Sequence, residues 1–317
     1  MASETLATRE RRGSLLGWFR ADTFEGVRRQ RAILGYLFLL PAFIGLVAFV
    51  VGPMFVSFGL SFYRWNIFKP PDPIGIANFQ RLLTDSRLPG IYGNTMLLVV
   101  GTVVITQVLA IALALGVTQL RSRKFAYFLR TAWFLPVLMS GAAVGVTLSY
   151  LFQREFGPIN YYLGVLGIDR IPWMTSASTV MYTIIITAVW KNLGFIFVIY
   201  LGGVVSLPQE ILDAADVDGA HGWRRLWTVT LPLISPIMLF ATVINVIGAM
   251  QIFDEPQIMT RGGPGDGSRT AVMYMYEVAF KEQEFGYGSA IAVTLFIAIL
   301  IVTGIQFALS RRWVFYG

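Results

Sequence analysis

The side chains best placed to do chemistry together lie in one segment, residues 209–232, between two long apolar stretches. Only 14% of the chain is charged, so the density of charge in this segment sets it apart. Its ionisable residues are Glu210, Asp213, Asp216, Asp218, His221, Arg224 and Arg225. Among the acids, Ile211, Ala214 and Ala215 recur at helical spacing and predict a short amphipathic helix over Glu210–Val217. A helix of this kind suits the binding of another protein, so we expect a docking surface rather than a catalytic centre.

The residues that follow indicate how this helix ends. Gly219 suits the sharp turn after a helix C-terminus, and Pro232 suits the first turn of the next helix, where its missing N–H costs nothing. The small side chains of Ala214 and Ala215 would let the helix sit deeply in a groove on another protein. An ordinary amphipathic connector is the alternative interpretation.

Composition excludes several kinds of active site. The chain has no cysteine and a single histidine, which excludes disulfides, thiolate metal sites, a cysteine nucleophile and a histidine metal cluster. The glycine-rich run 262–267 lacks the Lys-Ser/Thr of a phosphate-binding P-loop, and we interpret it as a tight turn. We therefore expect no catalytic residues, no metal and no cofactor bound by this chain. An energised function would need a partner acting in trans.

The elements that position this segment are apolar. Hydrophobic residues make up 56% of the chain, and a membrane-spanning helix needs about 20 mostly apolar residues. Six windows qualify: Ala32–Tyr63, Leu88–Leu120, Thr131–Gln153, Ile171–Pro208, Leu226–Phe253 and Phe285–Ser310. They do not alternate apolar and polar residues as barrel strands do. We therefore expect an all-α, polytopic membrane protein with a six-helix domain over 32–312, an N-terminal tail over 1–31 and a C-terminal tail over 313–317.

The distribution of Lys and Arg predicts the orientation, because these residues are enriched in cytoplasmic segments. With a cytoplasmic N-terminus, the inner segments hold fifteen and the outer segments nine. This bias predicts that both termini and the 209–232 segment are cytoplasmic. The net charge of +7 is then a topology signal, and we expect no nucleic-acid partner.

Lys191 is the only charge well inside a window, and no acid or histidine accompanies it there. Ion-coupled transporters usually carry such acids as relays, so we expect no coupling to an ion gradient. Lys191 either extends to the membrane interface along its apolar stem or lines a translocation path.

The 209–232 segment resembles the cytoplasmic coupling loop of permease subunits in bacterial ATP-binding cassette (ABC) importers. The pattern of that family is Glu-Ala-Ala, three residues, Gly, nine residues, then Ile, any residue, Leu-Pro. Here Asp213-Ala214-Ala215 is followed after three residues by Gly219, and after nine more by Val229-Thr230-Leu231-Pro232. The triplet Asp218-Gly219-Ala220 matches the sugar-importer version. Asp213 stands in place of the usual Glu, and Val229 in place of Ile.

The resemblance covers roughly residues 33–312. It includes residues 37–63, the stretch 74–79, Asn94-Thr95, and residues 251–254, 259–264 and 279–287. The carbohydrate-importer type of permease, as in maltose and glycerol-phosphate importers, is the most similar. The resemblance implies a type I ABC importer transmembrane domain in a bacterial inner membrane. It also implies four kinds of partner: a second homologous permease, two ATP-binding subunits that hold ATP and Mg, an extracytoplasmic substrate-binding protein, and the lipid bilayer.

The resemblance also implies a substrate path near the membrane midplane, lined by Asn192, Phe195, Asn245, Ala249 and Gln251. Amides and an aromatic ring suit a polyol, because hydroxyls need donors and acceptors and the C–H face of a sugar packs on a ring. Hydrogen bonds between helices are the alternative role for the amides. We expect Gly194, Gly202, Gly203 and Gly248 to allow close helix packing rather than to touch substrate. Neutral saccharides and phosphorylated polyols both stay open as substrates.

Two other function classes are disfavoured. A membrane-embedded enzyme, such as a lipid-modifying transferase, would need carboxylates or histidines at the membrane surface, whereas the acids here gather in the coupling pattern. A secondary transporter or channel would need intramembrane acids or a filter-like loop, and the sequence has neither.

Overall fold

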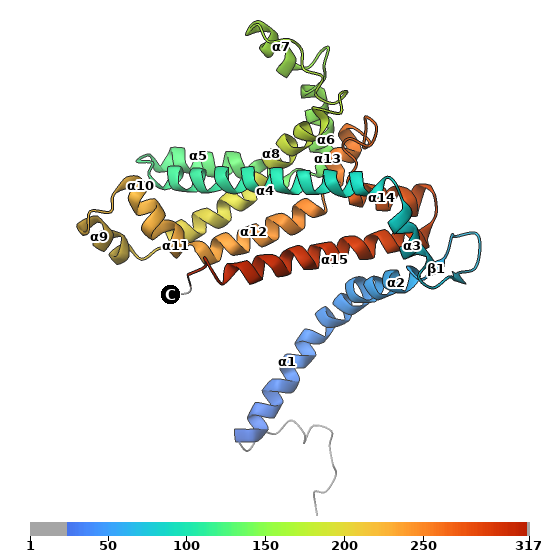
Figure 1. Cartoon of the computed structure of the whole chain (residues 1–317). Coiled ribbons are helices and arrows are strands. Elements are labelled where there is room, and N and C mark those ends of the chain that lie inside the picture. Colours follow the sequence, from blue (N-terminus) through green and yellow to red (C-terminus); the bar gives the residue numbers. More distant parts are fainter. Residues whose placement is uncertain (1–23, 316–317) are drawn as a thin grey trace, which may run out of the picture. The chain divides into compact units, whose positions relative to one another are not determined.

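The computed structural model describes residues 24–315 and is almost entirely helical (Figure 1). The chain divides after Gly59 into two units. The first, as far as it is described, is α1 (Phe24–Leu46), the wide turn η2 (Val47–Val51) and most of α2 (Gly52–Leu60), which form one apolar stretch over Val27–Leu60. Of the expected tails, residues 1–23 and 316–317 lie outside the described residues. Residues 24–31 already belong to α1.

The second unit is built on four long apolar helices, three of which are long enough by themselves to cross a membrane, while the candidate span that begins with the third in chain order continues to Met259. They are α4 (Leu88–Thr118), α8 (Val180–Val205), α12 (Ser235–Met250) and α15 (Phe285–Ser310). Each lies within one of the expected windows, because long runs of Val, Ile, Leu and Ala without charge favour a helix in hydrocarbon.

The third expected window is bent. The helices α5 (Arg123–Phe134) and η3 (Leu135–Leu138) meet α6 (Gly141–Leu151) at an angle of 104°. The bend lies where Met139 is extended and Ser140 begins the next helix, its hydroxyl accepting a hydrogen bond from the Ala143 N–H at 3.2 Å. Within residues 24–315, the bent pair and the five long apolar helices make six candidate spans.

The helix α8 is the centre of the second unit, with 61% of its most apolar window buried. It packs along α4, and α12 contacts α4, α8 and α15 (Figure 1). Two clusters of buried side chains fill the interior. One cluster, around Ile184 and Ile291, lies toward the end of the unit opposite the 209–232 segment. The other, around Phe197 and Ile234, lies toward that segment.

Short elements connect the long helices at both ends. One end carries the antiparallel pair β1 (Tyr63–Arg64) and β2 (Asp72–Pro73), in which Tyr63 pairs with Pro73. The same end carries α3 (Ala77–Thr84), α7 (Pro158–Val165), α13 (Asp254–Met259), α14 (Ala271–Tyr276) and the wide turn η5 (Glu277–Lys281). The opposite end carries α9 (Gln209–Val217), α10 (Gly222–Arg225), the wide turn η4 (Leu226–Thr230) and α11 (Leu231–Leu233).

A polar network at the α13 end fixes the loop that contains the glycine-rich run. Arg87 donates to both carboxylate oxygens of Asp266, at 2.9 and 3.1 Å, and the Asn94 amide donates to the Asp266 carbonyl at 2.7 Å. The hydrogen bond from Arg87 lowers the pKa of Asp266, so the pair is charged at neutral pH. Positive φ angles at Gly262 and Gly265 confirm the turn expected from the sequence.

Asp85 joins three elements at this end. It accepts hydrogen bonds from the hydroxyls of Tyr274, at 2.5 Å, and Tyr287, at 2.7 Å, and from the Arg87 N–H at 3.0 Å. Burial raises the pKa of Asp85, but these hydrogen bonds outweigh that effect and hold the pKa below its usual value. The carboxylate therefore ties the start of α4 to α14 and α15.

Candidate functional site

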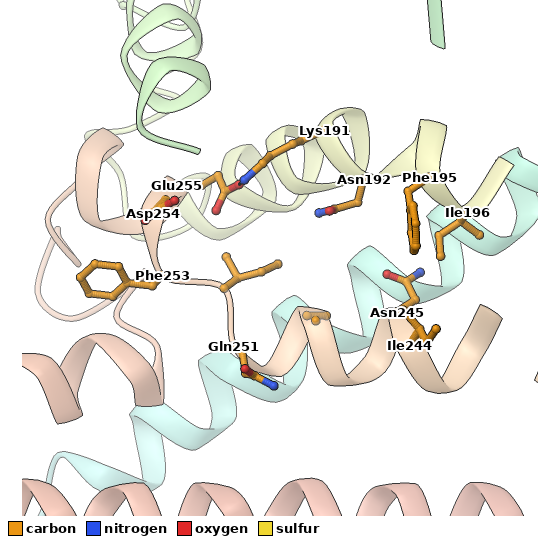
Figure 2. Close-up of a pocket in the computed structure, with 13 residues that line it drawn as sticks. Lys191, Asn192, Phe195, Ile196, Ile244, Asn245, Gln251, Phe253, Asp254 and Glu255 are labelled. Atoms are coloured by element: carbon orange, nitrogen blue, oxygen red, sulfur yellow. Dashed lines mark hydrogen bonds and ion pairs between the residues drawn. The ribbon is translucent and has the colours of Figure 1, made fainter. Parts of the chain in front are cut away.

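An open cavity of about 370 Å³ lies between α8 and α12, beside the connection from α12 to α13 (Figure 2). Side chains from both helices and from the connection point into it. Its lining residues are Lys191, Asn192, Phe195, Ile196, Ile244, Asn245, Gly248, Ala249, Gln251, Ile252, Phe253, Asp254 and Glu255.

All five residues expected on a substrate path line this one cavity. Asn192 and Phe195 are three residues apart on α8, and Asn245 and Ala249 are four apart on α12, so each pair lies on one helix face. Gln251 follows directly after α12. Figure 2 shows Phe195 and Asn245 facing one another across the cavity.

The three amides differ in their hydrogen bonds. The Asn192 amide donates to the Ala188 carbonyl at 2.9 Å, and the Gln251 amide to the Ile247 carbonyl at 3.3 Å, each within or next to its own helix. The Asn245 residue is only 6% exposed, and its buried amide nitrogen has no hydrogen-bond partner among the described residues. A buried donor without a partner costs free energy, so Asn245, which lines the cavity, carries an unsatisfied amide nitrogen.

Lys191 is partnered rather than extended to the membrane interface. Its Nζ donates to Glu255 Oε1 at 2.8 Å, and the Glu255 side chain is 3% exposed. Asp254 also lines the cavity, at the start of α13. Neither acid was among the predicted path residues, because the apolar window ends at Phe253, one residue before Asp254. A charge inside a membrane helix usually has a partner, and these acids are the first to follow the window.

The glycines divide into two groups. A Cβ at Gly194 would lie 2.0 Å from the Trp133 carbonyl oxygen, and one at Gly203 would lie 2.7 Å from Ile237 Cδ1, which confirms close packing at both. A Cβ at Gly202 or Gly248 would meet nothing within 4 Å. The packing role expected for these two is therefore wrong, and Gly248 lines the cavity instead. A helix packs closely only on the faces that meet a neighbour, and a sequence does not show which faces those are.

The 209–232 segment forms the short helix expected from the sequence, as α9 (Figure 1). The Ala220 N–H donates to the Ala215 carbonyl at 2.8 Å and the Gly219 N–H to the Asp216 carbonyl at 3.2 Å. This pair of bonds is the Schellman motif, which requires a left-handed residue after the helix. Gly219 supplies it with φ +76°.

Four of the eight expected docking residues are exposed. Asp213, Ala214, Asp218 and Gly219 are exposed. Asp213 accepts a hydrogen bond from the Gln209 amide at 2.8 Å. On the same helix Ile211 and Val217 are 41% and 88% exposed. Their spacing with Ala214 makes an apolar stripe along the outer face of α9.

The other expected residues of this segment support the helix from within the chain. Ala215 is buried, so only Ala214 of the alanine pair is free to enter a groove on another protein. Ala220 is half-buried, as are Leu231 and Pro232 in the first turn of α11, where the sequence predicted a proline.

An ion pair fixes α10 on α9. One guanidinium nitrogen of Arg225 lies 2.9 Å from each carboxylate oxygen of Asp216. Asp216 was not among the residues expected to couple, and its role here is to hold the two short helices together. Trp223, in α10, and Trp227, in η4, are 72% and 57% exposed and contact each other edge to face.

Within residues 24–315 no group of three or more His, Asp or Glu side chains is arranged to hold a metal ion. The candidate site thus has two parts, the cavity between α8 and α12 and the partly exposed helix α9 at the other end of these helices.

Known proteins resemble the chain over nearly its whole length. Residues 13–315 match the family model described as "Binding-protein-dependent transport system inner membrane component". The "Probable ABC transporter permease protein YurN" of Bacillus subtilis (strain 168) is 32% identical over 280 residues, covering 87% of this chain and 96% of the relative. The "Probable starch degradation products transport system permease protein AmyD" of Thermoanaerobacterium thermosulfurigenes is 30% identical over 286 residues, covering 89% and 96%.

A solved structure has the same fold. It is the crystal structure of a bacterial ABC transporter involved in the import of the acidic polysaccharide alginate. The matching chain has a TM-score of 0.78 and 24% identity, and the match covers 90% of this chain and 98% of that one.

Proposed function

The chain belongs to the family of binding-protein-dependent transport system inner membrane components, and we propose that it forms half of the translocation path of an ABC importer for a sugar or related polyol. It is a multi-pass permease subunit of the carbohydrate-importer type and not an enzyme. The observation that carries the proposal is that three amide side chains and an aromatic ring, those of Asn192, Asn245, Gln251 and Phe195, line one cavity between two membrane helices.

The chemistry of the cavity supports a polyhydroxylated substrate. The amides of Asn192, Asn245 and Gln251 offer donors and acceptors to hydroxyl groups. The ring of Phe195 is 42% exposed and offers a face to the C–H bonds of a sugar. The relative AmyD carries starch degradation products by its name, which is in keeping with this class of substrate.

Transport by this chain needs partners. A second homologous permease would complete the path, two ATP-binding subunits would supply ATP and Mg, and an extracytoplasmic binding protein would deliver the substrate. In this assembly the exposed stripe of α9, with Asp213 and Asp218 beside it, is the surface that an ATP-binding subunit grips. Closure of the ATP-binding subunits then moves α9, and through it α8 and α12, so that the cavity opens to alternate sides of the membrane.

Reconstitution tests this function. The chain is co-expressed with the permease, ATP-binding and binding-protein genes of its own transport system and placed in proteoliposomes. We expect ATP-dependent uptake that requires every component. Uptake that is independent of ATP would contradict the proposal.

A charge reversal tests the docking surface. Asp213→Lys should abolish substrate-stimulated ATP hydrolysis and retention of the ATP-binding subunit, while the chain still inserts in the membrane. Asp169→Lys makes the same change at an exposed residue near α7 and should retain the ATP-binding subunit. Wild-type retention by the Asp213 variant would refute the docking role.

A further inference from the structure

The cavity contains three charged side chains, and two of them are paired. Lys191 projects from α8 and Glu255 from the start of α13, and their ion pair is 2.8 Å long (Figure 2). The lysine side chain is 20% exposed and the glutamate 3%. The pair links α8 to α13, and the two residues lie 64 positions apart in the chain.

The third charge, Asp254, has no ion-pair partner among the described residues. Its carboxylate packs on α6, where a Cβ at Gly141 would lie 2.2 Å from Asp254 Oδ2. No other Lys, Arg, Asp or Glu lines the cavity. One lysine against two carboxylates leaves a net charge of −1.

We propose that this arrangement makes the cavity select uncharged polyols and reject phosphorylated or uronic-acid ones, with Glu255 as the specificity-determining residue. The proposal rests on the function proposed above, for which it names the substrate class. An anionic ligand would meet the negative charge of Asp254. To use Lys191 it would have to share an ammonium whose charge Glu255 already neutralises, or displace Glu255 and leave a buried carboxylate without a partner, which is strongly disfavoured.

An uncharged ligand meets no such cost. The amide of Asn245, which lines the cavity, and the exposed ring of Phe195 can serve a hydroxylated ring without disturbing the ion pair. Figure 2 shows these two residues at the end of the cavity away from Lys191 and Glu255. The ion pair therefore neutralises Lys191, and Asp254 leaves the site with a net negative charge, while the amides and the ring make the contacts.

The charge of the cognate ligand is the first test. Melting shifts of the purified binding protein from the same transport system are measured with neutral saccharides and polyols and with their phosphorylated or uronic-acid counterparts. We expect the largest shift from an uncharged compound. An anionic cognate ligand would overturn this inference, while ATP-dependent uptake of that ligand would leave the proposed function standing.

The second test measures the permease itself. Saturation-transfer difference NMR on the detergent-purified importer without its binding protein compares the cognate ligand with its monophosphate, and trehalose with trehalose 6-phosphate. The wild type should bind the neutral member of the cognate pair at least tenfold more tightly. Glu255→Gln frees Lys191 and should reduce that preference at least tenfold. Glu282→Gln makes the same change at an exposed carboxylate outside the cavity and should leave the preference unchanged.

A second variant keeps the test decisive if Glu255→Gln does not fold. Asp254→Asn alters an exposed carboxylate and removes the net negative charge. It should also reduce the preference for the neutral over the anionic ligand. Equal binding of neutral and anionic ligands by the wild type, or an unchanged preference in both variants, would contradict the inference.

Discussion

Asn245 and Asn160 are both buried asparagines, but the structure gives them opposite roles. The Asn160 amide donates to the Arg154 and Ile171 carbonyls, at 3.1 and 2.9 Å, and its oxygen accepts from Trp173 at 2.9 Å. The Asn245 amide nitrogen donates to nothing within the described chain. The bonded Asn160 contributes to the stability of the fold, whereas Asn245 carries an unsatisfied donor and lines the cavity.

This contrast gives a prediction at the residue scale. Asn160→Ala should lower the free energy of unfolding by about 1–3 kcal/mol, because partners lose their hydrogen bonds. Asn245→Ala should leave the melting temperature unchanged or raise it, while uptake falls about tenfold, the effect of roughly 1.4 kcal/mol of lost binding. Tryptophan-fluorescence melting in detergent and uptake by proteoliposomes measure the two effects. Full uptake by the Asn245 variant would remove this residue from the path.

Two glycines of α8 provide a second prediction at this scale. Gly194→Ala places a methyl group 2.0 Å from the Trp133 carbonyl oxygen, and overpacking of this kind costs about 1–3 kcal/mol. Gly202→Ala meets open space and should stabilise the helix by up to about 1 kcal/mol. Melting temperatures should therefore move in opposite directions, and equal shifts would contradict the packing seen at Gly194.

At the scale of elements, the C-terminal end of α9 determines how the segment that follows it is positioned. The Schellman motif at Gly219 sets the direction in which the chain leaves the helix, and the Asp216–Arg225 ion pair then holds α10 against it. The two short helices are thus one structural piece. Movement of a bound partner could reach the membrane helices only if the two short helices move together as a rigid unit.

A proline at Gly219 tests this element. Gly219→Pro removes an N–H that donates to Asp216 and imposes a negative φ where the chain has +76°. We expect the variant to insert in the membrane but to lose the ATP-binding subunit in a pull-down. Gly167→Pro is the matched control, because Gly167 follows α7 with φ +77°. If both variants lose the subunit, or neither does, the role of α9 is refuted.

At the scale of the whole molecule, the decisive property is which side of the membrane each end of the helices faces. The cavity and α9 are separated along α8 and α12, so they can work together only if these helices transmit movement across the bilayer. The proposed orientation puts α9 and both termini in the cytoplasm.

The absence of cysteine makes this orientation directly testable. Asp169→Cys and Asp218→Cys introduce single thiols at exposed positions near α7 and at the end of α9. In intact spheroplasts a membrane-impermeant maleimide should label the first and not the second, and permeabilised cells should show both labelled. The wild-type chain should stay unlabelled throughout. Labelling of Asp218→Cys from outside would reverse the topology.

The sequence by itself determined what depends on neighbouring residues. Apolar windows predicted the spans because a helix in hydrocarbon needs a continuous run of apolar side chains. The spacing of Ala214, Gly219 and Pro232 predicted α9, its turn and the next helix, because each is a local preference of the backbone.

The tertiary structure decided what depends on residues far apart in the chain. The partner of Lys191 is Glu255, 64 positions away, and no local pattern relates them. The bend at Ser140 broke a window that composition alone made continuous. Burial of Ala215, the open space at Gly248 and the missing partner of Asn245 likewise follow from which helix faces meet. Hydrophobicity places a helix in the membrane, but only packing against other helices decides which of its polar groups find a partner.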